Sequence, residues 1–145
     1  MPKQPSGSPT PNWQPIRVMH QCIPMIDGML EEVQTQYQNM LEAQKKPQTM
    51  DDYTIQRVIT VYSEQHNSLW LYREQLSRWK QENPTPKQLK EIHRLERQVD
   101  KIDQTLTGIL AIADEIKDKT IESILGKSDV DLALDVLMGN LKLPE

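Results

Sequence analysis

Histidine and cysteine side chains are the residues of this sequence best suited to metal or nucleophilic chemistry, and their spacing is unfavourable for both. The chain holds three histidines and one cysteine. His20 and Cys22 lie two positions apart, so on a helix their side chains point in different directions. His66 and His93 each follow a glutamate by two positions, whereas helical di-iron sites use Glu-x-x-His. We therefore expect no metal site and no cofactor.

Acidic residues supply no clear acid–base pair either. Three acidic pairs are adjacent in the sequence: Glu31 and Glu32, Asp51 and Asp52, and Asp114 and Glu115. Adjacent side chains diverge on a helix, so we interpret these pairs as solvated faces or helix-start charges. The sequence has no Gly-rich phosphate loop, GxSxG, HExxH or CxxC motif. These patterns predict a protein that is not an enzyme.

A basic stretch is the one charged surface with a candidate ligand. The net charge is −4, yet residues 73 to 101 hold eight basic and five acidic side chains. The basic residues are candidates for contact with phosphate or an acidic partner: Arg73, Arg78, Lys80, Lys87, Lys90, Arg94, Arg97 and Lys101. The alternative is a solvated face, because the interspersed acidic residues can pair with them at helical spacing. A net negative chain is not typical of a dedicated nucleic-acid binder.

The elements that must position these residues are predicted to be helices. Only five of the 145 residues are glycine, which is few for the turns of a sheet. Apolar residues recur in alternating steps of three and four, the repeat of an amphipathic helix. We predict helices over residues 13–46, 52–82, 86–125 and 129–138. The clearest apolar run belongs to the third of them: Ile92, Leu95, Val99, Ile102, Leu106, Ile109, Ala113 and Ile116.

Capping and breaking residues set the expected boundaries. Residues 1–11 are rich in proline and are predicted to be a flexible tail, followed by one domain over 12–145 with Asn12 as its first N-cap. Thr85, Pro86 and Gln88 form a strong helix-start signal. Pro24 lies inside the first apolar run, so either the helix kinks there or Pro24 begins a second helix.

Three apolar seams joined by short polar connectors predict an all-α fold. We expect an antiparallel bundle, or coiled-coil hairpins, of three long helices plus a short C-terminal helix. The third helix is expected to be the longest, so its C-terminal half needs further cover. The short last helix can supply part of it and a second copy of the chain the rest, which favours a dimer. Trp70 and Trp79 are either core anchors or interface residues.

The leading functional hypothesis is a non-enzymatic protein–protein interaction module, an adaptor or small subunit of a complex. The short apolar segment near the C-terminus is a candidate docking element, with capping of the bundle end as the alternative; its candidate residues are Val130, Leu132, Leu134 and Leu137. The second hypothesis is a helical small subunit of a nucleic-acid or ribonucleoprotein complex that uses the basic 73–101 hairpin.

The expected location is the cytoplasm. No stretch reaches the roughly 18 apolar residues of a membrane-spanning helix, so we expect no membrane contact. The single cysteine allows no internal disulfide and fits a reducing compartment. The first residues lack the apolar centre of a secretion signal.

Overall fold

The computed structural model describes residues 10–120 together with residues 134, 136 and 137. Every regular element in this part of the chain is helical, so the predicted all-α class is confirmed. Two short 3-10 turns accompany four α-helices; the elements are η1 (Ile16–Val18), α1 (Met19–Lys45), η2 (Pro47–Thr49), α2 (Asp52–Asn67), α3 (Leu69–Lys80) and α4 (Pro86–Lys117).

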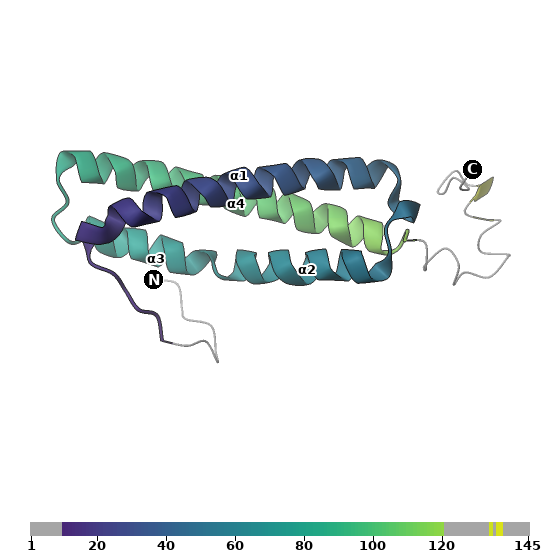
Figure 1. Cartoon of the computed structure of the whole chain (residues 1–145), viewed down its shortest axis with the longest axis horizontal. Coiled ribbons are helices and arrows are strands. Elements are labelled where there is room, and N and C mark those ends of the chain that lie inside the picture. The colour runs from purple at the N-terminus through teal and green to yellow at the C-terminus, as the bar shows by residue number, and fades with distance from the viewer. Residues whose placement is uncertain (1–9, 121–133, 135, 138–145) are drawn as a thin grey trace.

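The helices form three rods that lie side by side (Figure 1). One rod is α1, the second consists of α2 and α3 end to end, and the third is α4. Consecutive rods run in opposite directions (Figure 1). The most extensive contacts between helices all involve α4, which packs against α1, α2 and α3. The helix α4 is therefore the centre of the fold, and α1 and α3 meet each other far less closely.

The start of α4 and its buried stripe follow the sequence pattern. Thr85 accepts from the backbone N–H of Gln88 at 3.1 Å, and the Gln88 side chain accepts from the N–H of Thr85 at 2.9 Å. This reciprocal pair satisfies two N–H groups that a helix start leaves without partners. All eight residues of the predicted run from Ile92 to Ile116 are buried. Their side chains meet the seams of the other two rods in one core.

The second rod differs from the prediction, because the expected helix 52–82 is divided at Ser68. The backbone N–H of Ser68 donates to the carbonyls of Glu64 and Gln65, and its hydroxyl donates to Gln65 at 2.8 Å. A serine hydroxyl that bonds to the preceding turn competes with regular helical bonding. The apolar repeat continues through Ser68, so the pattern alone did not reveal the break.

The first rod also differs at its beginning. The predicted helix start at residue 13, with Asn12 as N-cap, is wrong, because regular structure begins at Ile16 and α1 at Met19. Pro15 favours extended geometry in the residue before it. Pro24 lies inside α1, so it does not begin a second helix.

Some predictions fall on residues outside the described part. They concern the tail before residue 10, the helix beyond residue 120 and most of the segment 129–138. Leu134 and Leu137 are described, and both are helical and exposed. Among the described residues, no helix is both long and apolar enough to cross a membrane.

Candidate functional site

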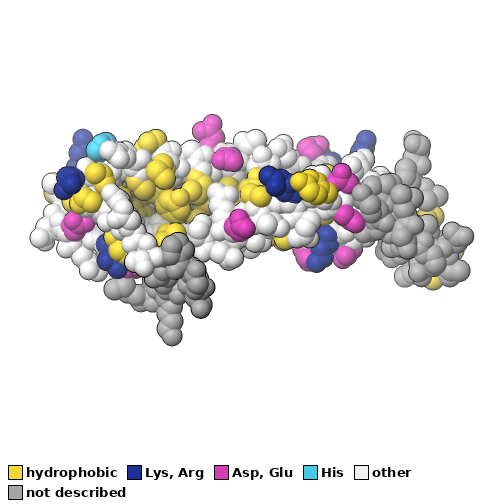
Figure 2. All heavy atoms as spheres, turned by 60° about the horizontal axis from the view of Figure 1, so that its bottom comes forward, with side chains coloured by type: hydrophobic (Ala, Val, Ile, Leu, Met, Phe, Trp, Pro, Cys, Tyr) yellow, Lys and Arg dark blue, Asp and Glu magenta, His cyan; other side chains and the backbone are white. Residues whose placement is uncertain are grey.

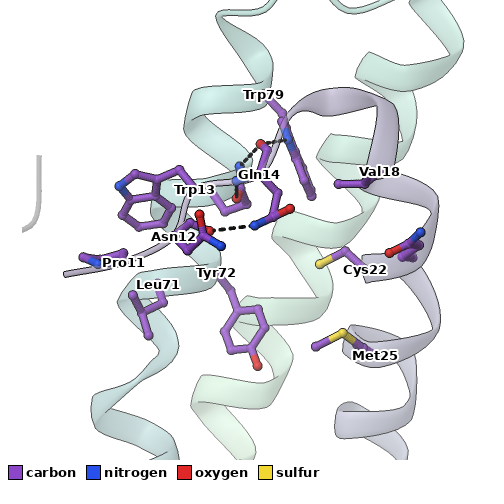
Figure 3. Close-up of a pocket in the computed structure, with 12 residues that line it drawn as sticks. Pro11, Asn12, Trp13, Gln14, Val18, Cys22, Met25, Leu71, Tyr72 and Trp79 are labelled. Atoms are coloured by element: carbon purple, nitrogen blue, oxygen red, sulfur yellow. Dashed lines mark hydrogen bonds between the residues drawn. The ribbon is translucent and has the colours of Figure 1, made fainter. Parts of the chain in front are cut away.

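An apolar groove opens between the first half of α1 and α3 (Figure 3). One end is closed by residues 11–14, an extended segment that we call the strap. The groove encloses about 410 Å³, within the range of sites that bind small molecules or side chains. Its lining consists of Pro11, Asn12, Trp13, Gln14, Val18, Gln21, Cys22, Met25, Leu71, Tyr72, Gln75 and Trp79.

Hydrogen bonds from α3 hold the strap in place. The backbone N–H of Gln14 donates to the Gln75 side chain at 2.8 Å, and the Gln75 amide donates back to the Gln14 carbonyl at 3.2 Å. The indole N–H of Trp79 donates to the same carbonyl at 2.9 Å (Figure 3). The strap is therefore held through its main chain, since all three bonds involve the backbone N–H or carbonyl of Gln14.

The side chain of Trp13 fastens the strap on its outer side. Its ring meets Trp70 edge to face, with ring centroids 6.2 Å apart. The guanidinium of Arg78 lies 4.6 Å from the centroid of Trp13, the geometry of a cation–π contact. Together these contacts join two indole rings and a cation along α3.

Among the described residues, the lining of the groove is mainly hydrophobic and carries no charged side chain. Cys22 and Met25 of α1 form one wall together with Val18 of η1, and Leu71 and Tyr72 belong to the α3 wall. The polar residues at the groove are neutral amides, Asn12, Gln14, Gln21 and Gln75. Met25 is the large hydrophobic side chain of the lining that is most exposed to solvent, at 56%. Figure 2 shows hydrophobic side chains gathered in a patch toward the end of the molecule where the strap lies.

The two ionisable groups of the groove are held neutral. Burial raises the pKa of the Cys22 thiol above its ordinary value, and thiolate, not thiol, is the reactive form. Burial also raises the pKa of Tyr72, with a smaller contribution from the nearby Cys22. At neutral pH both groups are therefore mainly uncharged, in keeping with the apolar lining of the groove. No group of three potential metal-binding side chains lies together in the described part of the chain.

Four of the eight predicted basic contacts are paired with carboxylates. The pairs join Arg73 to Asp100 and Asp103, Arg78 to Glu74, Lys80 to Glu96, and Arg94 to Asp27 and Glu91. The most elaborate is that of Arg94, which donates to both carboxylate oxygens of Asp27 at 3.0 and 2.8 Å. Arg73, Lys80 and Arg94 thus join α4 to another helix, whereas Arg78 pairs within α3. The charge of all four cations is largely neutralised.

The other four basic residues form an open stripe. Lys87, Lys90, Arg97 and Lys101 are exposed, and within the described residues none has a carboxylate oxygen within 4.0 Å. Their spacing of three, seven and four residues places them on one face of α4. The structure thus separates the predicted basic cluster into a structural half and a solvent-facing half.

The remaining candidate residues divide in the same way. Trp79 is buried in the core, whereas Trp70 is half-buried beneath Trp13. Leu134 and Leu137 of the docking segment are 51% and 82% exposed, so neither has been covered by the fold. Val130 and Leu132 lie outside the described residues.

The groove itself escaped prediction, although the sequence carries one signal of it. Val18, Cys22, Met25 and Met29 recur in steps of four, three and four. They form a second apolar stripe beside the core seam of α1. A helix with two neighbouring stripes has more apolar surface than one seam needs. The strap gives no such signal, because its bonds reach residues more than 60 positions away.

Comparison with known protein families, curated proteins and solved structures finds no match to this chain. The groove and the basic stripe are therefore the features of the chain that indicate a function.

Proposed function

We propose that this protein is a non-enzymatic protein–protein interaction module, an adaptor or small subunit, that binds an apolar segment of a partner in the groove between α1 and α3. The observation that carries the proposal is this open, uncharged groove of about 410 Å³. Contacts among the described residues leave it unfilled, although it is lined by side chains that a core would normally bury.

The shape of the groove favours a helical partner segment. Two helices stand side by side with apolar stripes facing the opening, which is the arrangement into which a further amphipathic helix packs. Met25 and Cys22 add soft, polarizable side chains that adapt to differently shaped ligands. The neutral amides around the opening can donate and accept hydrogen bonds at the rim of such an interface.

Affinity purification with matched variants tests the proposal. Met25→Glu places a charge on the wall of the groove at a site that is already 56% exposed, so folding should survive. Gln38→Glu introduces the same charge at an exposed position of α1 that does not line the groove. We expect one partner that co-purifies with the natural chain and with Gln38→Glu but not with Met25→Glu.

Binding of the purified partner then gives the quantitative result. We expect Met25→Glu to weaken the affinity at least about tenfold, because burying an unpaired carboxylate costs more than 1.4 kcal/mol. Equal affinity of the two glutamate variants would contradict the proposal. If the natural chain and Gln38→Glu form dimers while Met25→Glu stays monomeric, the partner is a second copy of the chain.

A second candidate function is favoured by the open basic stripe on α4. Its four exposed cations, spaced along one helix face, could bind the phosphates of a nucleic acid. Lys90→Glu combined with Arg97→Glu tests this function, because neither side chain has an ion-pair partner in the described part of the chain. Arg94 is unsuitable for the test, since its loss also breaks the bond between α1 and α4. Binding of RNA or DNA that weakens steeply with salt and with the double variant would support it.

A further inference from the structure

We infer that α3 carries a recognition site for an extended peptide that contains a tryptophan, and that the strap occupies this site as an internal ligand. A partner segment of the same chemistry, Trp-x-Pro in extended form, would bind there once the strap has left. The inference goes beyond the proposed function, because this site recognises main-chain atoms and an aromatic ring instead of the apolar face of a helix.

The site binds both main-chain polar groups of one residue of the strap. The side-chain amide of Gln75 accepts from the N–H of Gln14 at 2.8 Å and donates back to its carbonyl at 3.2 Å. The indole N–H of Trp79 donates to the same carbonyl at 2.9 Å (Figure 3). Because N–H and carbonyl groups are common to all residues except proline, the site accepts almost any side chain at this position.

A second part of the site selects the residue before it. Trp70, Glu74 and Arg78 recur every four residues and therefore share one face of α3. The ring of Trp13 meets Trp70 edge to face and lies 4.6 Å from the guanidinium of Arg78. Glu74 is only 5% exposed and accepts from Arg78 Nε at 3.2 Å, which holds the guanidinium in place. Since tryptophan gives the strongest cation–π contact, this face favours tryptophan over other residues.

The proline that follows the strap completes the recognised sequence. Pro15 is extended, with φ −71° and ψ 156°, and a proline also restricts the preceding residue to extended geometry. Gln14 therefore presents its N–H and carbonyl to α3 in a preset conformation. Proline has no N–H of its own, so this position leaves no donor without a partner. The shortest sequence that fits the site is thus Trp-x-Pro.

The strap is separate from the core that holds the helices together. Among the described residues, the core and the hydrophobic side chains packed against it begin at Ile16, after the strap. The strap also lies between two cavities, the groove of about 410 Å³ and a second cavity of about 460 Å³, and Trp13 and Gln14 line both. A longer partner segment in place of the strap has space for further contacts on either side. Such contacts are what a partner needs to displace a tethered ligand.

Nuclear magnetic resonance of the full-length protein tests the inference, with a capped synthetic peptide of residues 10–15 as the probe. Trp13→Ala with Gln14→Pro releases the strap, because the ring contacts and the N–H donor are lost together. We expect the peptide to shift the indole signals of Trp70 and Trp79 in this released variant until the site is saturated. The natural chain should bind the peptide at least about tenfold more weakly, as expected if its own strap occupies the site nine-tenths of the time or more.

Matched changes show which contacts carry the binding. A peptide with alanine in place of its tryptophan should bind the released variant at least about tenfold more weakly, because the contacts with Trp70 and Arg78 are lost. Gln75→Leu added to the released variant should weaken binding of the original peptide about tenfold, because its main-chain bonds to Gln75 are lost. Gln104→Leu, at an exposed site on α4, is the control and should leave the affinity unchanged.

Other outcomes overturn the inference. Equal affinity of the peptide for the natural chain and the released variant would place its binding elsewhere. Equal affinity of the two peptides would show that the tryptophan is not recognised. The inference also fails if no saturable shift appears at about 10 mM peptide, in the range of effective concentrations that a short tether provides. Loss of the core signals of α4 in the released variant would make the strap part of the core instead of a ligand.

This inference and the proposed function fail in different ways. If the peptide binds as expected while Met25→Glu loses no partner, the strap site stands and the function proposed for the groove is wrong. If Met25→Glu loses the co-purified partner but the peptide does not bind the released variant, the strap is only a structural cap and this inference alone is wrong.

Discussion

Trp79 donates its indole N–H to the backbone carbonyl of Gln14, 65 residues earlier in the chain, at 2.9 Å. The indole ring is buried in the core, while Gln14 belongs to the exposed strap. Trp79 thus packs in the core with its ring and holds the strap at the end of the groove with its N–H. Because the acceptor is a main-chain oxygen, the bond does not depend on the side chain at position 14.

The first prediction concerns the strap. Gln75→Leu removes both side-chain bonds to Gln14 and leaves only the bond from Trp79. Each lost bond is worth about 0.5–1.5 kcal/mol. We expect the Gln14 amide to exchange with deuterium about tenfold faster in Gln75→Leu, while the exchange of core amides in α4 stays nearly unchanged. Gln104→Leu, at an exposed site on α4, is the control and should leave Gln14 protected.

The second prediction compares the two helical glycines of the described chain. A Cβ at Gly28 would meet no atom within 4 Å, whereas a Cβ at Gly108 would lie 2.8 Å from Cε2 of Tyr37. Alanine is favoured over glycine inside a helix by up to about 1 kcal/mol. We therefore expect Gly28→Ala to raise the free energy of unfolding by about 0.5–1 kcal/mol. Gly108→Ala should give no gain or a loss, because the ring of Tyr37 must move.

Urea denaturation measures both changes, and a double variant identifies the cause. In a Tyr37→Ala background the obstacle at position 108 is gone, so Gly108→Ala should recover the stabilisation seen at position 28. A loss that persists without the ring would show that the contact with Tyr37 is not responsible.

Sequence alone predicted the parts of the fold that depend on local periodicity. The alternating run of α4 and the capping signal at Thr85 both appear where the pattern placed them. The break at Ser68 was missed because the apolar repeat passes through it without interruption. The segment from Trp13 to Pro15 was assigned to a helix, since the hydrogen bonds that keep it extended come from distant residues.

The candidate site was harder to predict for a physical reason. A basic cluster is visible in sequence, but its pairing is not: Arg94 finds Asp27 across 67 positions, while Arg97, three residues on, faces solvent. The groove depends on a gap between α1 and α3, which only the packing of both helices on α4 creates. Such a gap is a property of tertiary packing, so no short sequence motif predicts it.

The third prediction concerns the reactivity of Cys22. Burial raises the pKa of its thiol, so thiolate is scarce at neutral pH. We expect the rate of alkylation by iodoacetamide in the folded protein to reach half of its maximum above pH 9, the ordinary pKa of the group, whereas the urea-unfolded chain should reach half of its maximum near pH 9. A folded protein whose rate levels off at or below pH 8.5 would contradict the assignment of Cys22 to an apolar wall.

The last prediction concerns the bond between α1 and α4 and its dependence on pH. Hydrogen bonds from Arg94, helped by Gln98, lower the pKa of Asp27 below its ordinary value although burial opposes the shift. A carboxylate with a lowered folded pKa contributes stability above its unfolded pKa of about 3.9, and this is lost as the pH falls through the folded pKa. Since both side chains are 36% exposed, solvent screening limits the contribution to about 1 kcal/mol. Urea denaturation should therefore show Asp27→Asn less stable than the natural chain by that amount at pH 7, with the difference vanishing toward pH 2. Asp114→Asn breaks the pair of an exposed carboxylate with Lys117 and should change stability little at pH 7. A deficit of Asp27→Asn that stays constant from pH 7 to pH 2 would assign it to packing rather than to the ion pair.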